Sequence, residues 1–143
     1  MIKKILSLIC LLGLLLTGCS SPAARDESVD LDLTVFSSTL LSAEIQKIMV
    51  NPDNYVGKRI KAIGTYSSFF YDETGKYYHY VVTRAGDACC MEGLEFIWSD
   101  DHVYPDDYPE EQVRIEVVGV FNTYTEHGYP YGYLAVDKIT VLR

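Results

Sequence analysis

A long alternating segment, Lys58 to Tyr71, constrains the fold more than any other part of the chain. One face of this segment is formed by Ile60, Ala62, Gly64 and Tyr66. Such a period of two is typical of a half-buried strand. A glycine near the middle of so long a strand permits a sharp bend, so the strand can take part in both halves of a small closed barrel.

Four shorter segments also have the composition of strands, at 77–84, 94–98, 112–122 and 133–142. Asp72 to Lys76 predicts a hairpin turn, and Glu126 to Gly132 predicts a second turn. The first strand is long and bent, and the third and fourth are separated by a longer connection. This order indicates a mainly β fold, a small five-stranded OB-like Greek-key barrel.

One short helix is predicted before the first strand, over Ala43 to Val50, with Ser42 as its N-cap. Its apolar face is formed by Ile45, Ile48 and Met49. Pro52 ends the helix, since proline disfavours helical geometry at the preceding residue. The connection 99–111 has two prolines and no apolar period, so we expect the N-terminal helix to close one end of the barrel.

The N-terminus has the features of a bacterial secretion leader. Lys3-Lys4 precedes an apolar run from Ile5 to Leu16 that is too short for a permanent membrane span. Leu16-Thr17-Gly18-Cys19 matches a lipobox, in which the cysteine thiol receives diacylglycerol and further acyl chains such as palmitate. An ordinary cleaved signal with an unmodified Cys19 is the alternative. The predicted organisation is a lipoprotein signal peptide at 1–18, lipidation at Cys19, a flexible tether at 19–32 and a domain at 33–143.

The charge of the mature chain limits its partners. Loss of the leader removes Lys3 and Lys4 but no acid, so twelve basic residues become ten against twenty acids, a formal net charge of −10. Such a chain repels phosphate backbones and anionic lipid surfaces, which argues against nucleic acid as a partner. We expect a protein tethered to the cell membrane by its acyl chains, facing outside the cytoplasm, with a membrane protein or the cell wall as partner.

Cys89 and Cys90 are the only thiols left once the leader is removed and Cys19 is lipidated. Outside the cytoplasm the pair has three alternatives: a metal site, a redox-active or vicinal disulfide, or burial as small apolar side chains. The further ligands expected for zinc are His79, His102 and Glu92. His79 is favoured because strands 77–84 and 94–98 should pair across the loop that holds the cysteines.

Three of the twelve tyrosines alternate within and after the second predicted turn, at Tyr129, Tyr131 and Tyr133. OB-folds use the corresponding loop to hold ligands, and rings there would stack on sugars or on a partner surface. The alternative is that tyrosines at alternating strand positions cover the barrel as a half-buried layer.

Three motifs carry a resemblance to known proteins: Asn51-Pro52-Asp53-Asn54-Tyr55-Val56-Gly57-Lys58, Asp87-Ala88-Cys89-Cys90 with Gly93-Leu94-Glu95-Phe96, and Tyr104-Pro105-Asp106-Asp107-Tyr108-Pro109. Together they resemble a group of uncharacterised bacterial lipoproteins with an OB-like domain. The cysteine motif is also similar to the C-terminal domain of permease subunits of unknown function. The resemblance covers most of 31–142. It implies an OB-like fold and a location at the membrane, but it implies no activity and no ligand set.

No catalytic motif is present: the chain has no Gly-x-Ser-x-Gly, no His-Glu-x-x-His and no phosphate loop. A thiol-disulfide oxidoreductase needs a low-pKa thiolate, which the acidic surroundings of Cys89 and Cys90 oppose. We therefore predict a membrane-anchored extracytoplasmic lipoprotein that acts as a binding or accessory module and not as an enzyme. A zinc-binding lipoprotein using the two cysteines and a thiol redox protein are the alternatives.

Overall fold

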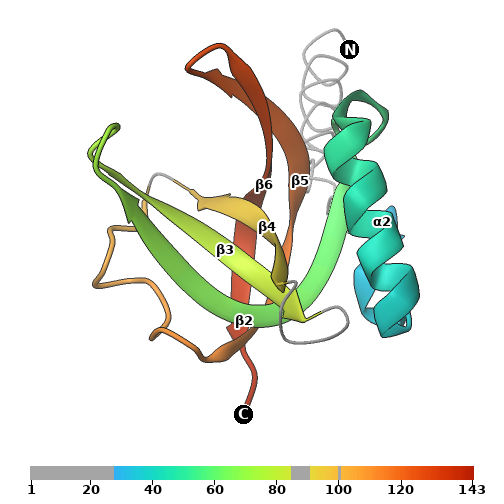
Figure 1. Ribbon diagram of the computed structural model, residues 1–143. Helices are drawn as coiled ribbons and strands as arrows, with labels where there is room; N and C mark the ends of the chain where they lie inside the picture. The colour runs from blue at the N-terminus through green and yellow to red at the C-terminus, as the bar shows by residue number, and fades with distance from the viewer. Residues whose placement is uncertain (1–27, 85–90, 100) are drawn as a thin grey trace, which may run out of the picture.

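The computed structural model describes residues 28–84, 91–99 and 101–143. These residues form a mainly β fold in which six strands make one sheet and an α-helix packs beside it (Figure 1). The strands are β1 (Leu31–Asp32), β2 (Arg59–Tyr71), β3 (Lys76–Arg84), β4 (Met91–Trp98), β5 (Arg114–Glu126) and β6 (Tyr129–Val141). The helices are α2 (Ser38–Val50) and the 3-10 helices η1 (Leu33–Val35) and η2 (Pro52–Asn54). No helix within the described ranges is both long and apolar enough to span a membrane.

The long strand β2 organises the sheet because it pairs with two different partners. Residues 59–65 run antiparallel to β5, and residues 65–71 run antiparallel to β3. β3 pairs with β4, β4 runs parallel to β6, and β6 pairs with β5. β2 consequently curves through the whole sheet, from the helix to the far hairpin (Figure 1).

Gly64 lies next to the point where β2 passes from one partner to the other. A Cβ on this residue would overlap the carbonyl oxygen of Val82 on β3, so only glycine permits this approach of the two backbones. The long strand predicted at 58–71 is confirmed, and Ile60, Ala62 and Tyr66 on its predicted face are fully buried.

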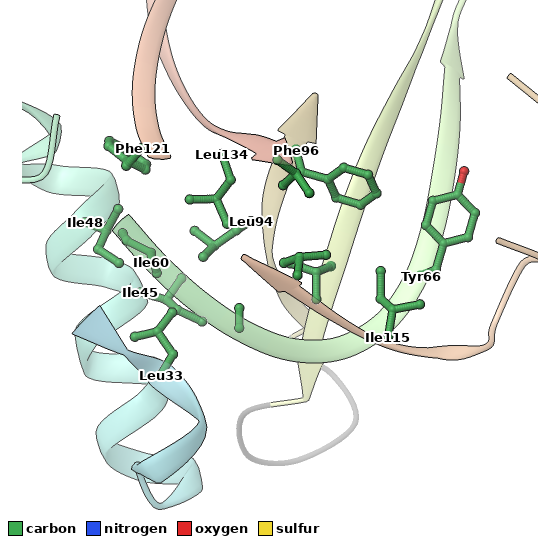
Figure 2. Close-up of a cluster of buried hydrophobic side chains, with 14 residues drawn as sticks. Leu33, Ile45, Ile48, Ile60, Tyr66, Leu94, Phe96, Ile115, Phe121 and Leu134 are labelled. Carbon is green, nitrogen blue, oxygen red and sulfur yellow. The ribbon is translucent and has the colours of Figure 1, made fainter. Parts of the chain in front are cut away.

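The hydrophobic core lies between α2 and the inner face of the strands (Figure 2). Its largest apolar members come from η1, α2, β2, β4, β5 and β6: Leu33, Ile45, Ile48, Ile60, Tyr66, Leu94, Phe96, Ile115, Phe121 and Leu134. β3 adds Val81. Each such side chain contributes about 1.5–3 kcal/mol when it is removed from water. This single core supports the hairpins that extend beyond it.

The helix begins at Ser38 and not at the predicted Ala43. The prediction was wrong because it left out one turn of the apolar stripe. The side chains that pack on the core have the spacing i, i+4, i+7 and are Leu41, Ile45 and Ile48. Met49, predicted on the same face, is 50 % exposed.

The chain joins the sheet before the predicted start of the domain at Leu33. Leu31 and Asp32 pair in parallel with β2, and the Asp30 N–H donates to the Arg59 carbonyl at 2.8 Å. Backbone pairing therefore orders residues that were expected to belong to the tether.

The turn between β5 and β6 is shorter than the predicted 126–132. It consists of His127 and Gly128, which both have positive φ, at 49° and 84°. Two successive positive φ values are typical of the tight turns that match the twist of a hairpin. Tyr129 and Tyr131 are consequently strand residues and not loop residues.

Candidate functional site

Two long hairpins, β2–β3 and β5–β6, extend away from α2 (Figure 1). Side chains of both hairpins line a groove. The groove has a volume of about 420 Å³. The first hairpin contributes Phe69, Tyr71, Glu73, Tyr78 and Tyr80, and the second contributes Tyr124, Glu126, His127, Tyr129 and Tyr131. We call this surface the tyrosine groove.

Several rings of the tyrosine groove are open to solvent. Phe69 is 60 % exposed and Tyr129 is 67 % exposed. Tyr124 and Tyr131 stack with their centroids 5.4 Å apart, so they form a flat double platform. Large exposed aromatic surfaces that gather in one concavity are typical of binding sites.

A polar bridge joins the two hairpins. The Tyr78 hydroxyl donates to the Glu126 carboxylate at 2.7 Å, and Lys76 Nζ lies 3.6 Å from the same carboxylate. These contacts link β3 of the first hairpin with the end of β5 in the second.

A second cavity of about 400 Å³ adjoins the groove and shares Tyr78, Tyr124 and Glu126 with it. We call it the acidic cavity, because Glu95 of β4 also lines it. Glu95 is only 8 % exposed, and both of its carboxylate oxygens accept from the Tyr124 hydroxyl, at 3.2 and 3.0 Å. Burial raises the pKa of Glu95 to about 7, helped by repulsion from Glu126 and opposed by the Tyr124 hydrogen bond.

The predicted tyrosines separate in the structure. Tyr129 and Tyr131 line the tyrosine groove, whereas Tyr133 lines a different hollow beside Trp98 and Asp137. Tyr133 reaches the groove residues only through an edge-on contact with Tyr124, at 5.8 Å.

A closed aromatic cluster packs on the inner side of the same strands. Its members are Tyr66, His79, Phe96, Tyr104 and Tyr108. The Tyr66 hydroxyl and His79 Nδ1 are hydrogen-bonded at 2.9 Å, and the ring of Tyr108 lies 4.2 Å from the His79 ring. Burial lowers the pKa of His79 to about 4, so the imidazole is neutral at neutral pH.

Cys89 and Cys90 lie outside the described residues. His79 precedes Arg84, the last residue of β3, by five positions, which is roughly 17 Å along an extended strand. Within the described ranges, no group of three or more His, Cys, Asp or Glu side chains is arranged to hold a metal ion. Zinc binding by the two cysteines and His79 therefore stays a prediction without support from the described residues.

Glu92 and His102, the other ligands considered, have packing roles. Glu92 accepts from Ser42 Oγ at 3.0 and 2.9 Å and from Gln46 Nε2 at 3.3 Å, which ties α2 to β4. Ser42 lies inside α2, which begins at Ser38, and the predicted N-cap is therefore wrong: the N-cap is Ser37. His102 stacks on Trp98 with centroids 3.7 Å apart.

Sequence reasoning missed Phe69, Tyr78, Glu95 and Tyr124. One signal was present for Glu95, because a single carboxylate interrupts the apolar run from Leu94 to Trp98. A charged residue at such a position is unfavourable unless the fold uses it.

A scan against models of known protein families finds no match to this chain, and a search of curated proteins finds no significant relative.

Proposed function

We propose that the chain is a membrane-anchored extracytoplasmic lipoprotein whose domain is a non-catalytic binding module, with the tyrosine groove as its ligand-binding face. The observation that carries the proposal is the gathering of exposed aromatic rings from two hairpins around one concavity. Surface tyrosines scattered at random would not share a groove or stack on one another.

The order of strand pairing supports the finer proposal of an OB-like barrel. The pairings run β2–β3–β4–β6–β5 and return to β2, with β4 and β6 parallel. In OB-folds, ligands lie across the second and third strands, between the first and the last hairpin loop. β3, β4 and the two hairpins of the tyrosine groove correspond to these elements.

The chemistry of the groove favours a cell-wall glycan as the ligand. Tyrosine rings present flat apolar faces together with hydroxyl groups, a combination that suits sugars. Glu73 and Glu126 line the groove and disfavour a polyanion such as nucleic acid. The alternative ligand is a peptide or a membrane protein, and the test below distinguishes it from a glycan.

The test is co-sedimentation of the mature protein with purified cell wall. We expect Phe69→Ala and Tyr129→Ala to weaken binding. Phe70→Ala is the matched control, because Phe70 is the next residue of β2, is 44 % exposed and does not line the groove. If Phe69→Ala and Phe70→Ala bind cell wall equally well, the tyrosine groove is not the binding face. If a membrane protein is captured in place of cell wall, the ligand is that protein and not a glycan.

The lipid anchor has its own test. Intact mass of the membrane-extracted protein should show diacylglycerol and acyl chains on Cys19, and Cys19→Ser should release the protein from the membrane fraction. An unmodified thiol at Cys19 would contradict the proposal.

A further inference from the structure

The acidic cavity combines features that the tyrosine groove alone does not have. Its polar floor is Glu95, a carboxyl group held between β3 and β6, opposite Tyr80 on one side and Tyr133 on the other. None of the ion pairs among the described residues includes Glu95. Its only hydrogen-bond donor in that part of the chain is the Tyr124 hydroxyl. A buried carboxylate without a cation is costly, which makes this cavity a candidate for a ligand that supplies the missing charge.

The groups that face Glu95 leave that charge unmatched. Glu126 adds a second negative charge, and Lys76, which also lines the cavity, pairs with Glu126 at 3.6 Å from a side chain that is 67 % exposed. Tyr78 and Tyr124 contribute hydroxyl groups, and His79 is kept neutral by burial. When Glu95 is ionised, two carboxylates face the single ammonium of Lys76, so the lining is negative and disfavours anionic ligands.

Most of the remaining lining is aromatic. It consists of Tyr77, Tyr78, Phe96, Tyr108 and Tyr124, together with His79, Ile97 and Thr125. Aromatic faces attract organic cations and pack against alkyl stems, whereas a hard metal ion needs several oxygen ligands and water in place of rings.

We propose that the acidic cavity binds a protonated amine of the ligand that lies along the tyrosine groove, with the Glu95 carboxylate as its counter-charge and the tyrosine rings as its walls. This inference rests on the proposed function, because the cavity and the groove share Tyr78, Tyr124 and Glu126. The chemical class is a primary ammonium group on an apolar stem or on a sugar ring.

The test is calorimetric titration of the mature protein with two amines that distinguish these sources. Nα-acetyl-lysine amide represents an alkyl stem, and glucosamine represents an amino sugar. Each is compared with its N-acetylated, uncharged counterpart. We expect at least one amine to bind about tenfold more tightly than its counterpart, because a charge-assisted hydrogen bond to a carboxylate is lost on acetylation.

Glu95→Gln should weaken binding of that amine about tenfold. It keeps an acceptor for the Tyr124 hydroxyl, and thermal unfolding verifies that the variant is folded. Glu110→Gln is the matched control, since it removes the same charge at an exposed position that lines neither cavity. Equal binding of the charged and acetylated compounds, absence of binding by both amines, or unchanged binding by Glu95→Gln would overturn the inference.

The two proposals fail separately. If Phe69→Ala loses cell-wall binding while Glu95→Gln keeps both cell-wall and amine binding, the groove stands and the amine site is refuted. If the wild type does not sediment with cell wall, the glycan proposal fails, and the amine titration still decides the cavity.

Discussion

The closed aromatic cluster and the tyrosine groove are built from the same residue types on neighbouring strands, but they differ in exposure. Tyr66 of the cluster is fully buried, whereas Phe69 and Tyr129 of the groove are mostly exposed. Along β3, Tyr78 and Tyr80 line the groove, whereas His79 between them faces the closed cluster. Successive strand residues point to opposite faces, so one short run serves both regions. Tyr104 and Tyr108, from the connection between β4 and β5, pack on His79. The side chains that cover a tyrosine, and not the number of tyrosines in the sequence, distinguish a tyrosine that packs within the protein from one that is free to bind a ligand.

The largest expected difference between the two regions is in stability. Tyr66 is fully buried, so Tyr66→Ala should lower the free energy of unfolding by about 3–5 kcal/mol, as other large-to-small core substitutions do. Urea unfolding at neutral pH measures this change. Tyr66→Phe keeps the ring and should lose only about 1 kcal/mol, for the hydrogen bond to His79. A loss below 1 kcal/mol in the alanine variant would mean that the cluster is not closed.

Titration of Glu95 should destabilise the protein as the pH rises. Its pKa is raised from the ordinary 4.5 to about 7, so the folded state binds more protons than the unfolded state between these values. Wild-type stability should therefore fall by about 3 kcal/mol from pH 4.5 to above pH 7 on account of this group. Glu95→Gln lacks the charge and should gain that amount relative to wild type, as urea unfolding over this pH range would show. A constant difference between the two proteins would contradict the buried carboxyl.

His79 should act in the opposite direction. Its pKa is lowered from 6.5 to about 4, so the unfolded state binds more protons in this range, and stability falls as the pH decreases. His79→Gln should become more stable relative to wild type by up to about 3 kcal/mol between pH 6.5 and pH 4. Between pH 4.5 and 6.5 the effects of Glu95 and His79 on stability have opposite signs. The plot of wild-type stability against pH should therefore be flatter in this range than the plot for either variant.

The smallest expected effect on stability belongs to the groove. Tyr129→Ala should change the free energy of unfolding by less than about 0.5 kcal/mol, because the ring is mostly exposed. The same substitution should reduce cell-wall binding in the sedimentation assay. A large loss of stability would place Tyr129 with the packing residues and remove it from the proposed site.

Much of the fold was predictable from periodicity. The alternation around Gly64 identified β2 and its buried face, and the Asp72–Lys76 turn identified the first hairpin. The errors occurred where pairing or packing overrides a local pattern. β1 forms because a long neighbour offers free backbone groups, and the helix starts early because Leu41 reaches the core.

The candidate site was predictable only in part. Tyr129 and Tyr131 stood out because they alternate near a turn. Tyr124 pairs directly with Tyr131 across the β5–β6 turn, so its place follows once the two-residue turn is known. Phe69 lies on β2 and meets these residues only through the bend of that strand, which no local spacing encodes. Cys89 and Cys90 were singled out by their chemistry alone, and because they lie outside the described residues, the metal site, the disulfide and burial all stay predictions.

The short parallel pairing of Leu31 with Ile60 also determines how the domain is presented. It joins the chain to the first residues of β2, whereas Phe69 and Tyr71 of the groove lie near the other end of the same strand. Nine residues of extended chain between Ile60 and Phe69 span at most about 30 Å. The proposed anchor at Cys19 would therefore reach the domain at the end of β2 that is remote from the groove, so that the length of this strand separates the point of attachment from the ligand-binding face.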